Sequence, residues 1–172
     1  MPRVEAWLRG SVPGVPPLLM PAAHAILHAV EDADRALESL TPAEIWTRPG
    51  SAPSVGYHLR HLAGSLDRLL TYARGAPLSE AQRASLRGER DAGDLPLDRA
   101  ALQALVRSAA DAGIAQLRAT PESTLLEPRG VGRQQLPATV VGLIFHAAEH
   151  AARHAGQAIT TARIIRGLRQ PS

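Results

Sequence analysis

The chain has 172 residues, of which 45% are hydrophobic and 20% charged, a balance that is ordinary for one soluble globular domain. It contains no cysteine, so disulfides and thiolate metal ligands are excluded, and a transition-metal site would have to use histidine and carboxylate. All nineteen basic residues are arginine, and aromatic residues make up only 3%. Because alanine, leucine and arginine are strong helix formers, this composition favours an all-α fold.

The net charge is only +3, and the arginines are scattered along the chain rather than gathered into a stripe with aromatic residues. We therefore expect no nucleic-acid partner. No apolar run approaches the length of a membrane span, and the N-terminus lacks the charged-then-apolar pattern of a signal peptide. These features predict a cytoplasmic protein that does not associate with a membrane.

Helical periodicity begins after an irregular lead-in over residues 1–17, which is rich in proline and glycine. Apolar residues recur at helical spacing over residues 18–40 and predict the first long helix. Thr41 and Glu44 have the spacing of a capping box and predict a short helical turn. A second long helix is predicted over residues 55–74.

The second half of the chain contains two further long helices. Residues 76–96 are polar and predict a short helix between breaks, and the third long helix is expected over residues 97–119. Residues 120–137 hold three prolines and two glycines, and residues 125–136 within them favour a short extended excursion. The fourth helix is then expected over residues 138–167. We predict one domain over residues 1–172, an all-α four-helix bundle with a long crossover before the last helix.

Seven histidines form three groups on the predicted long helices. They are His24 and His28, then His58 and His61, and finally His146, His150 and His154. Residues four apart share one face of an α-helix, so two imidazoles at that spacing can bind one transition metal, with a third ligand from elsewhere in the fold. The pair on the first helix lies nearly opposite the apolar face, and we interpret it as solvent-exposed.

Helical-wheel positions rank the other histidines by their angle from the core. On the last helix, His154 lies near the flank of the apolar face, His150 lies further out and His146 points to solvent. On the second helix, periodicity favours His58 over His61 as the inward-facing residue. A metal site in a cleft at the edge of the bundle would instead need ligands on the flanks of both helices. His61 and His150 lie at similar angles from the apolar faces of their own helices, which is consistent with two flanks that meet across a groove. For each histidine, an ordinary hydrogen-bonded or exposed side chain remains the alternative.

Two motifs resemble the DinB/YfiT-like superfamily. They are SVGYHLRHLA over residues 54–63 and HAARHAGQ over residues 150–157. LTPAEIWTRPG, over residues 40–50, is similar to the stretch that precedes the family's second helix. The resemblance covers residues 18–167. It implies a four-helix bundle, commonly a homodimer, in which three histidines hold a divalent metal.

Carried over residue by residue, the resemblance implies that His61, His150 and His154 are the metal ligands. It overrules the preference of the wheel for His58, which becomes a candidate neighbour in the pocket, and it gives His146 no firm counterpart. Imidazole ligands suit zinc and nickel, our expected metals, with iron as an alternative.

The carboxylates nearest to these ligands in the sequence are Glu149 and Asp67. Either one could accept a hydrogen bond from a ligand or act as a general base. An exposed charge on the helix surface is the simpler interpretation of both. No catalytic residue is assigned from the sequence.

Three imidazoles leave at least one coordination position open, which is typical of a catalytic or ligand-binding site rather than a structural one. The family includes proteins that resemble metal-dependent hydrolases and enzymes that use low-molecular-weight thiols, such as thiol S-transferases and a mycothiol-dependent maleylpyruvate isomerase. The resemblance therefore implies a metal-dependent hydrolase or thiol transferase that acts on a small molecule. The alternative is a non-catalytic helical dimer with a weak or vestigial metal site, acting in stress response or ligand binding, because the sequence shows no compelling nucleophile or substrate motif.

Overall fold

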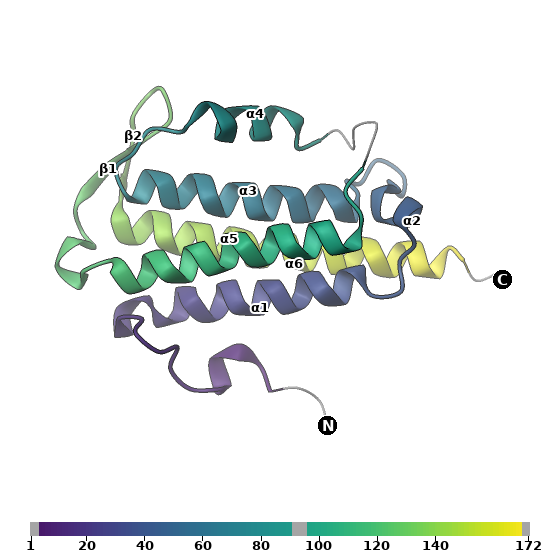
Figure 1. Ribbon diagram of the computed structural model, residues 1–172, viewed down its shortest axis with the longest axis horizontal. Helices are drawn as coiled ribbons and strands as arrows, with labels where there is room; N and C mark the ends of the chain where they lie inside the picture. Colours follow the sequence, from purple (N-terminus) through teal and green to yellow (C-terminus); the bar gives the residue numbers. More distant parts are fainter. Residues whose placement is uncertain (1–3, 91–95, 170–172) are drawn as a thin grey trace.

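Four long helices pack side by side in the structure, a computed structural model that describes residues 4–90 and 96–169 (Figure 1). These helices are α1 (Met20–Leu37), α3 (Val55–Ala73), α5 (Arg99–Ala119) and α6 (Val140–Gly167). Both α1 and α3 pack against α5 and α6. The predicted all-α four-helix bundle is therefore confirmed. None of the described helices is long and apolar enough to cross a membrane.

Three of the long helices begin where a side chain satisfies a free N–H group of the first turn. The side chains of Ser54, Asp98 and Thr139 accept these hydrogen bonds at the starts of α3, α5 and α6. The shorter elements are the 3-10 turns η1 (Ala6–Leu8), η2 (Pro17–Leu19) and η3 (Glu122–Thr124), the helices α2 (Pro42–Trp46) and α4 (Glu80–Gly88), and the strands β1 (Pro128–Val131) and β2 (Leu136–Thr139). The predicted capping box at the start of α2 is present.

The long crossover lies before the third long helix, and our prediction that it precedes the last helix is wrong. Helices α3 and α5 run in the same direction: Trp46, at the end of α2 in the segment that leads into α3, donates a hydrogen bond to the carbonyl of Leu97, just before α5. Near the other ends, Gln116 donates to the carbonyl of Leu70. Because parallel neighbours cannot be joined by a short turn, the chain returns along the outside of α3 through α4 (Figure 1).

The segment before α6 does not cross the bundle, because α5 and α6 are antiparallel and meet at the same end. Strands β1 and β2 form an antiparallel hairpin there, with Pro128 opposite Thr139 and Val131 opposite Leu136. The turn between them contains Gly132, whose φ of 69° is easy for glycine. The predicted extended excursion is therefore present as a hairpin that connects α5 to α6 at one end of the bundle (Figure 1).

Small side chains line the buried face of α6. Its fully buried alanines include Ala147, Ala151, Ala155, Ala158 and Ala162. Without bulky groups on this face, the backbones of α1 and α3 can lie close to α6. This packing allows side chains on the flanks of α3 and α6 to meet.

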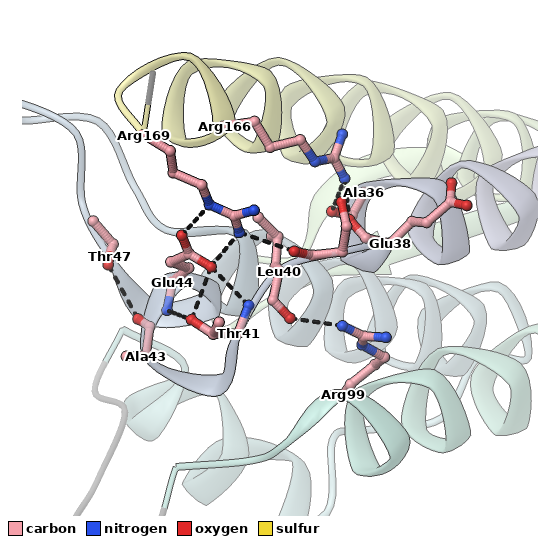
Figure 2. Close-up of polar contacts among 11 residues, drawn as sticks. Ala36, Glu38, Leu40, Thr41, Ala43, Glu44, Thr47, Arg99, Arg166 and Arg169 are labelled. Carbon is pink, nitrogen blue, oxygen red and sulfur yellow. Dashed lines mark hydrogen bonds and ion pairs between the residues drawn. The ribbon is translucent and has the colours of Figure 1, made fainter. Parts of the chain in front are cut away.

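The last turns of α6 are fastened to the connection between α1 and α2 (Figure 2). Arg166 donates to the carbonyls of Arg35 and Ala36, at 3.1 and 3.2 Å, and also to that of Glu38. These carbonyls lie at the end of α1, where a helix lacks partners of its own. Arg169 pairs with the carboxylate of Glu44 in α2.

Candidate metal centre

Three histidines from α3 and α6 come together at the edge of the bundle. One ligand nitrogen from each of His61, His150 and His154 lies within 4.8 Å of the other two. Nε2 of His61 is 3.0 Å from Nε2 of His150, and the ring centroid of His154 is 4.5 Å from that of His61. The structure thus gathers the three residues that the resemblance implies, while their metal binding stays a prediction.

The electrostatics of this cluster favour neutral imidazoles. Burial lowers the pKa of His154 to about 3, and repulsion from His61 and His150 adds to the shift. Burial and the neighbouring His61 also lower the pKa of His150. Two of the three rings therefore have free lone pairs at neutral pH, which is the state in which imidazole binds a metal.

Glu89, at the end of α4, is the carboxylate that contacts the cluster. Its Oε2 accepts a 2.7 Å hydrogen bond from Nδ1 of His61, and its side chain is 4% exposed. Because a carboxylate accepts this bond, Nδ1 of His61 carries a proton, and Nε2 of the same ring faces His150. The donor set fits a divalent transition metal, since a carboxylate that orients a ligating imidazole is a common partner of such sites.

Two residues of α3 fix the position of Glu89: Arg68 binds its carboxylate, and Gly64 leaves room for it. Nη1 of Arg68 donates to the other oxygen of Glu89 at 2.5 Å, and both side chains are buried. Burial alone would raise the pKa of Glu89, but the hydrogen bonds from His61 and Arg68 outweigh it and lower the pKa below its ordinary value. A Cβ at Gly64 would lie 2.3 Å from the Glu89 carboxylate, so glycine leaves the space that the carboxylate occupies.

Sequence reasoning missed Glu89 and named two other carboxylates. Glu149 accepts hydrogen bonds from His146 and Arg153 on the outer side of α6. Asp67 accepts from Gln82 of α4. Asp67 is exposed, which agrees with the simpler interpretation as a surface charge. Glu149 is half-buried and makes no described hydrogen bond to the three clustered histidines, but one of its oxygens lies within 4.8 Å of ligand nitrogens of His146 and His150.

His58 lies next to the cluster and deeper in the bundle, as the helical wheel indicates. It is 4% exposed, and its Nδ1 is 3.1 Å from Nδ1 of His154. Burial, with the charge of His61, lowers its pKa to about 4. One of the two Nδ1 atoms must donate to the other, so His58 fixes the orientation of His154 much as Glu89 fixes that of His61.

The remaining histidines lie outside the three-residue cluster. His146 is half exposed and bonds to Glu149. His24 and His28 are half-buried rather than fully exposed, because the lead-in covers α1 and the carbonyl of Gly10 lies 2.9 Å from Nε2 of His24. The interpretation of this pair as solvent-exposed is therefore only partly correct, since the side chain of His28 is 35% exposed.

A cavity of about 730 Å³ borders the inner histidines. It is lined by Ala52, Pro53, Tyr57, His58, Arg153, His154, Gly156, Gln157, Thr160, Thr161 and Ile164. The ring of Tyr57 also stacks on His61, with centroids 5.6 Å apart and planes inclined by 12°. A small molecule in this cavity would therefore contact the histidine cluster directly.

The fold is shared with solved structures. A conserved protein from Enterococcus faecalis is 23% identical, with a TM-score of 0.66, and the match covers 86% of this chain and 96% of that one. The colibactin self-resistance protein ClbS, solved in complex with double-stranded DNA, is 18% identical with a TM-score of 0.59, and the match covers 87% and 96% of the two chains. No curated protein matches the chain. A sequence model described as the DinB superfamily matches residues 19–158, and the chain belongs to this superfamily.

Proposed function

We propose that this protein is a metal-dependent enzyme of the DinB type in which His61, His150 and His154 hold one divalent transition metal. Zinc and nickel are the expected metals, and iron is the alternative. The reaction is the hydrolysis of a small molecule or the transfer of a low-molecular-weight thiol. The observation that carries the proposal is the convergence of three imidazoles from two antiparallel helices, one of them oriented by the buried pair of Glu89 and Arg68.

A metal held by three imidazoles supplies an electrophilic centre with an open position, which can activate water, polarise a carbonyl or bind a thiolate. The chain's own residues orient and enclose this position. Glu89 keeps the proton of His61 on Nδ1. Tyr57 covers one face of the His61 ring, and Arg153 and Gln157 line the adjoining cavity, where they can bind polar groups of a substrate.

Metal analysis of protein purified without a histidine tag tests the site. The proposal predicts about one metal ion per chain in the wild type and little in the His61→Ala, His150→Ala and His154→Ala variants. His146→Ala is the matched control, because His146 lies one turn before His150 on the same helix and bonds to Glu149. Full metal content in the His150→Ala and His154→Ala variants would refute the assignment.

Activity assays separate the enzyme from the non-catalytic alternative. Panels of esters, amides and thiol acceptors should reveal metal-dependent turnover that is lost in His61→Ala. A folded, metal-loaded protein with no turnover on any of these panels would instead support a ligand-binding or stress-response role. Homodimerisation and a cytoplasmic location are part of the proposal, and light scattering of the purified protein tests the first of them.

Nucleic-acid binding is a second candidate, favoured by one observation. ClbS, which shares this fold, was solved with double-stranded DNA, and this counts against our expectation of no nucleic-acid partner. Against the candidate, many of the arginines of the described chain are paired with carboxylates, including Arg9, Arg35, Arg68, Arg107, Arg153 and Arg169. Retention of a DNA duplex at physiological salt, with a steep salt dependence, would support DNA binding.

A further inference from the structure

A second cavity borders Tyr57 where three segments of the chain meet. These segments are the connection after α2, the start of α3 and the residue that follows Glu89 at the end of α4. The cavity has a volume of about 300 Å³ and is lined by Arg48, Ser51, Pro53, Ser54, Tyr57 and Arg90. It thus lies beside the candidate metal centre but contains none of the three clustered histidines.

Two guanidinium groups give this cavity a positive charge. Within residues 4–90 and 96–169, neither Arg48 nor Arg90 has a hydrogen bond or an ion pair, and the described lining includes no acidic residue. Arg68, by contrast, is paired with the carboxylate of Glu89. Both arginines are exposed, so a solute can reach their guanidinium groups.

The start of α3 adds further donors on the same side. Ser54 is the N-cap, and its hydroxyl accepts a 3.1 Å hydrogen bond from the backbone N–H of Tyr57. The same hydroxyl can donate its own proton, Ser54 lines the cavity, and the positive end of the helix dipole lies here. Together with the hydroxyl of Ser51, these groups suit an anion with several oxygen atoms.

The cavity adjoins the histidine site. Pro53 and Tyr57 line both this cavity and the larger one that contains His58 and His154. The Tyr57 ring, which stacks on His61, therefore forms a shared wall.

We propose that Arg48 and Arg90 form an anion subsite, and that the substrate of the metal centre is a small molecule with a carboxylate or phosphate group. This inference rests on the proposed function. The anionic group is held by the two guanidinium groups, the hydroxyl of Ser51 and the start of α3. The reacting end of the same molecule then lies on the other side of Tyr57, at the histidine cluster.

Matched thiol probes test the subsite on cobalt-loaded protein, where thiolate binding changes the visible absorption spectrum. Mercaptosuccinate carries two carboxylates, and thioglycerol is a neutral thiol of similar size. We expect mercaptosuccinate to bind the wild type about tenfold more tightly or better, as charge-assisted hydrogen bonds allow. The advantage should vanish in Arg48→Gln/Arg90→Gln.

The control variant is Arg133→Gln/Arg163→Gln, which removes two exposed arginines from other parts of the surface. It should keep the preference for the anionic thiol. The subsite is refuted if the control loses the preference as strongly as the Arg48→Gln/Arg90→Gln variant. It is also refuted if the Arg48→Gln/Arg90→Gln variant keeps the preference, because the carboxylates would then simply chelate the metal.

Calorimetry on chelator-treated protein separates this inference from the proposed function. Inorganic phosphate and succinate should bind the metal-free chain in a manner that depends on Arg48 and Arg90, and their relative affinities show which anion the subsite prefers. If the chain proves to hold no metal but these anions still bind, the proposed function fails and the subsite stands. If a DNA duplex binds through the same two arginines and displaces the small anions, the small-molecule assignment is overturned.

Discussion

His61 and Glu89 are joined by a 2.7 Å hydrogen bond, although they lie 28 positions apart and on different elements. The bond links α3, which contains the candidate ligand His61, to the end of α4, which belongs to the crossover between α3 and α5. Arg68 anchors the other carboxylate oxygen, so the contact is buried and held from two sides. Glu89 is therefore placed to set the orientation and tautomer of His61.

The Glu89→Gln variant should bind metal about 10- to 100-fold more weakly, because partners that orient a ligating imidazole contribute this much to affinity. The amide can still fill the space but cannot offer His61 a charged acceptor. Competition with a chromophoric chelator measures the effect. Asp67→Asn, which changes an exposed carboxylate bonded to Gln82, should leave the affinity unchanged. Equal affinities in wild type and Glu89→Gln would contradict the role assigned to Glu89.

Metal should stabilise the protein if it binds the folded state and not the unfolded state. At a free metal concentration 100-fold above the dissociation constant, the gain is about 2.7 kcal/mol. For a domain of this size that corresponds to a rise of about 5–10 °C in melting temperature. Differential scanning fluorimetry with and without a chelator measures the shift. His146→Ala should keep the shift and His61→Ala should lose it, and a shift that survives His61→Ala would argue for a different binding site.

The Gly56→Ala variant should destabilise the protein by about 1–3 kcal/mol, the usual cost of overpacking a buried contact. An added Cβ would lie 2.8 Å from three ring carbons of Trp46, and this ring is held by its hydrogen bond to the carbonyl of Leu97. Urea unfolding should show a lower midpoint at an unchanged slope. Gly156→Ala is the control, since nothing lies within 4 Å of its added Cβ, and its stability should stay equal or rise by up to about 1 kcal/mol.

The ion pair between Glu44 and Arg169 should stabilise the folded protein at neutral pH but not in acid (Figure 2). Hydrogen bonds from Arg169 and Thr41 lower the pKa of Glu44 from 4.5 to about 2. Because the folded pKa is the lower one, the contribution is present above pH 4.5 and is lost as the pH falls towards 2. The melting temperatures of wild type and Glu44→Gln should thus differ at neutral pH and converge in acid. A constant difference across this range would be inconsistent with the lowered pKa.

Helical periodicity is sufficient to predict the four long helices, because each buries an apolar face whose spacing is visible in the sequence. The wheel also placed His58 deeper than His61, but geometry alone did not select His61, which came from the family resemblance. Helix direction was not predictable, since it depends on distant contacts such as that between Gln116 and Leu70. Glu89 was missed for the same reason: it lies in a polar segment without periodicity, and only the crossover brings it to His61.

Arg166 and Arg169 bind the α1–α2 connection, and these bonds hold the end of α6 and this connection together as one cooperative unit. The last turn of α6 cannot fray without releasing the carbonyls at the end of α1 and the carboxylate of Glu44. Backbone amides of α2 and of the end of α6 should therefore exchange with solvent at similar rates. Since Arg48 lies two residues after the end of α2, loosening the C-terminal turn would also relax the wall of the anion subsite.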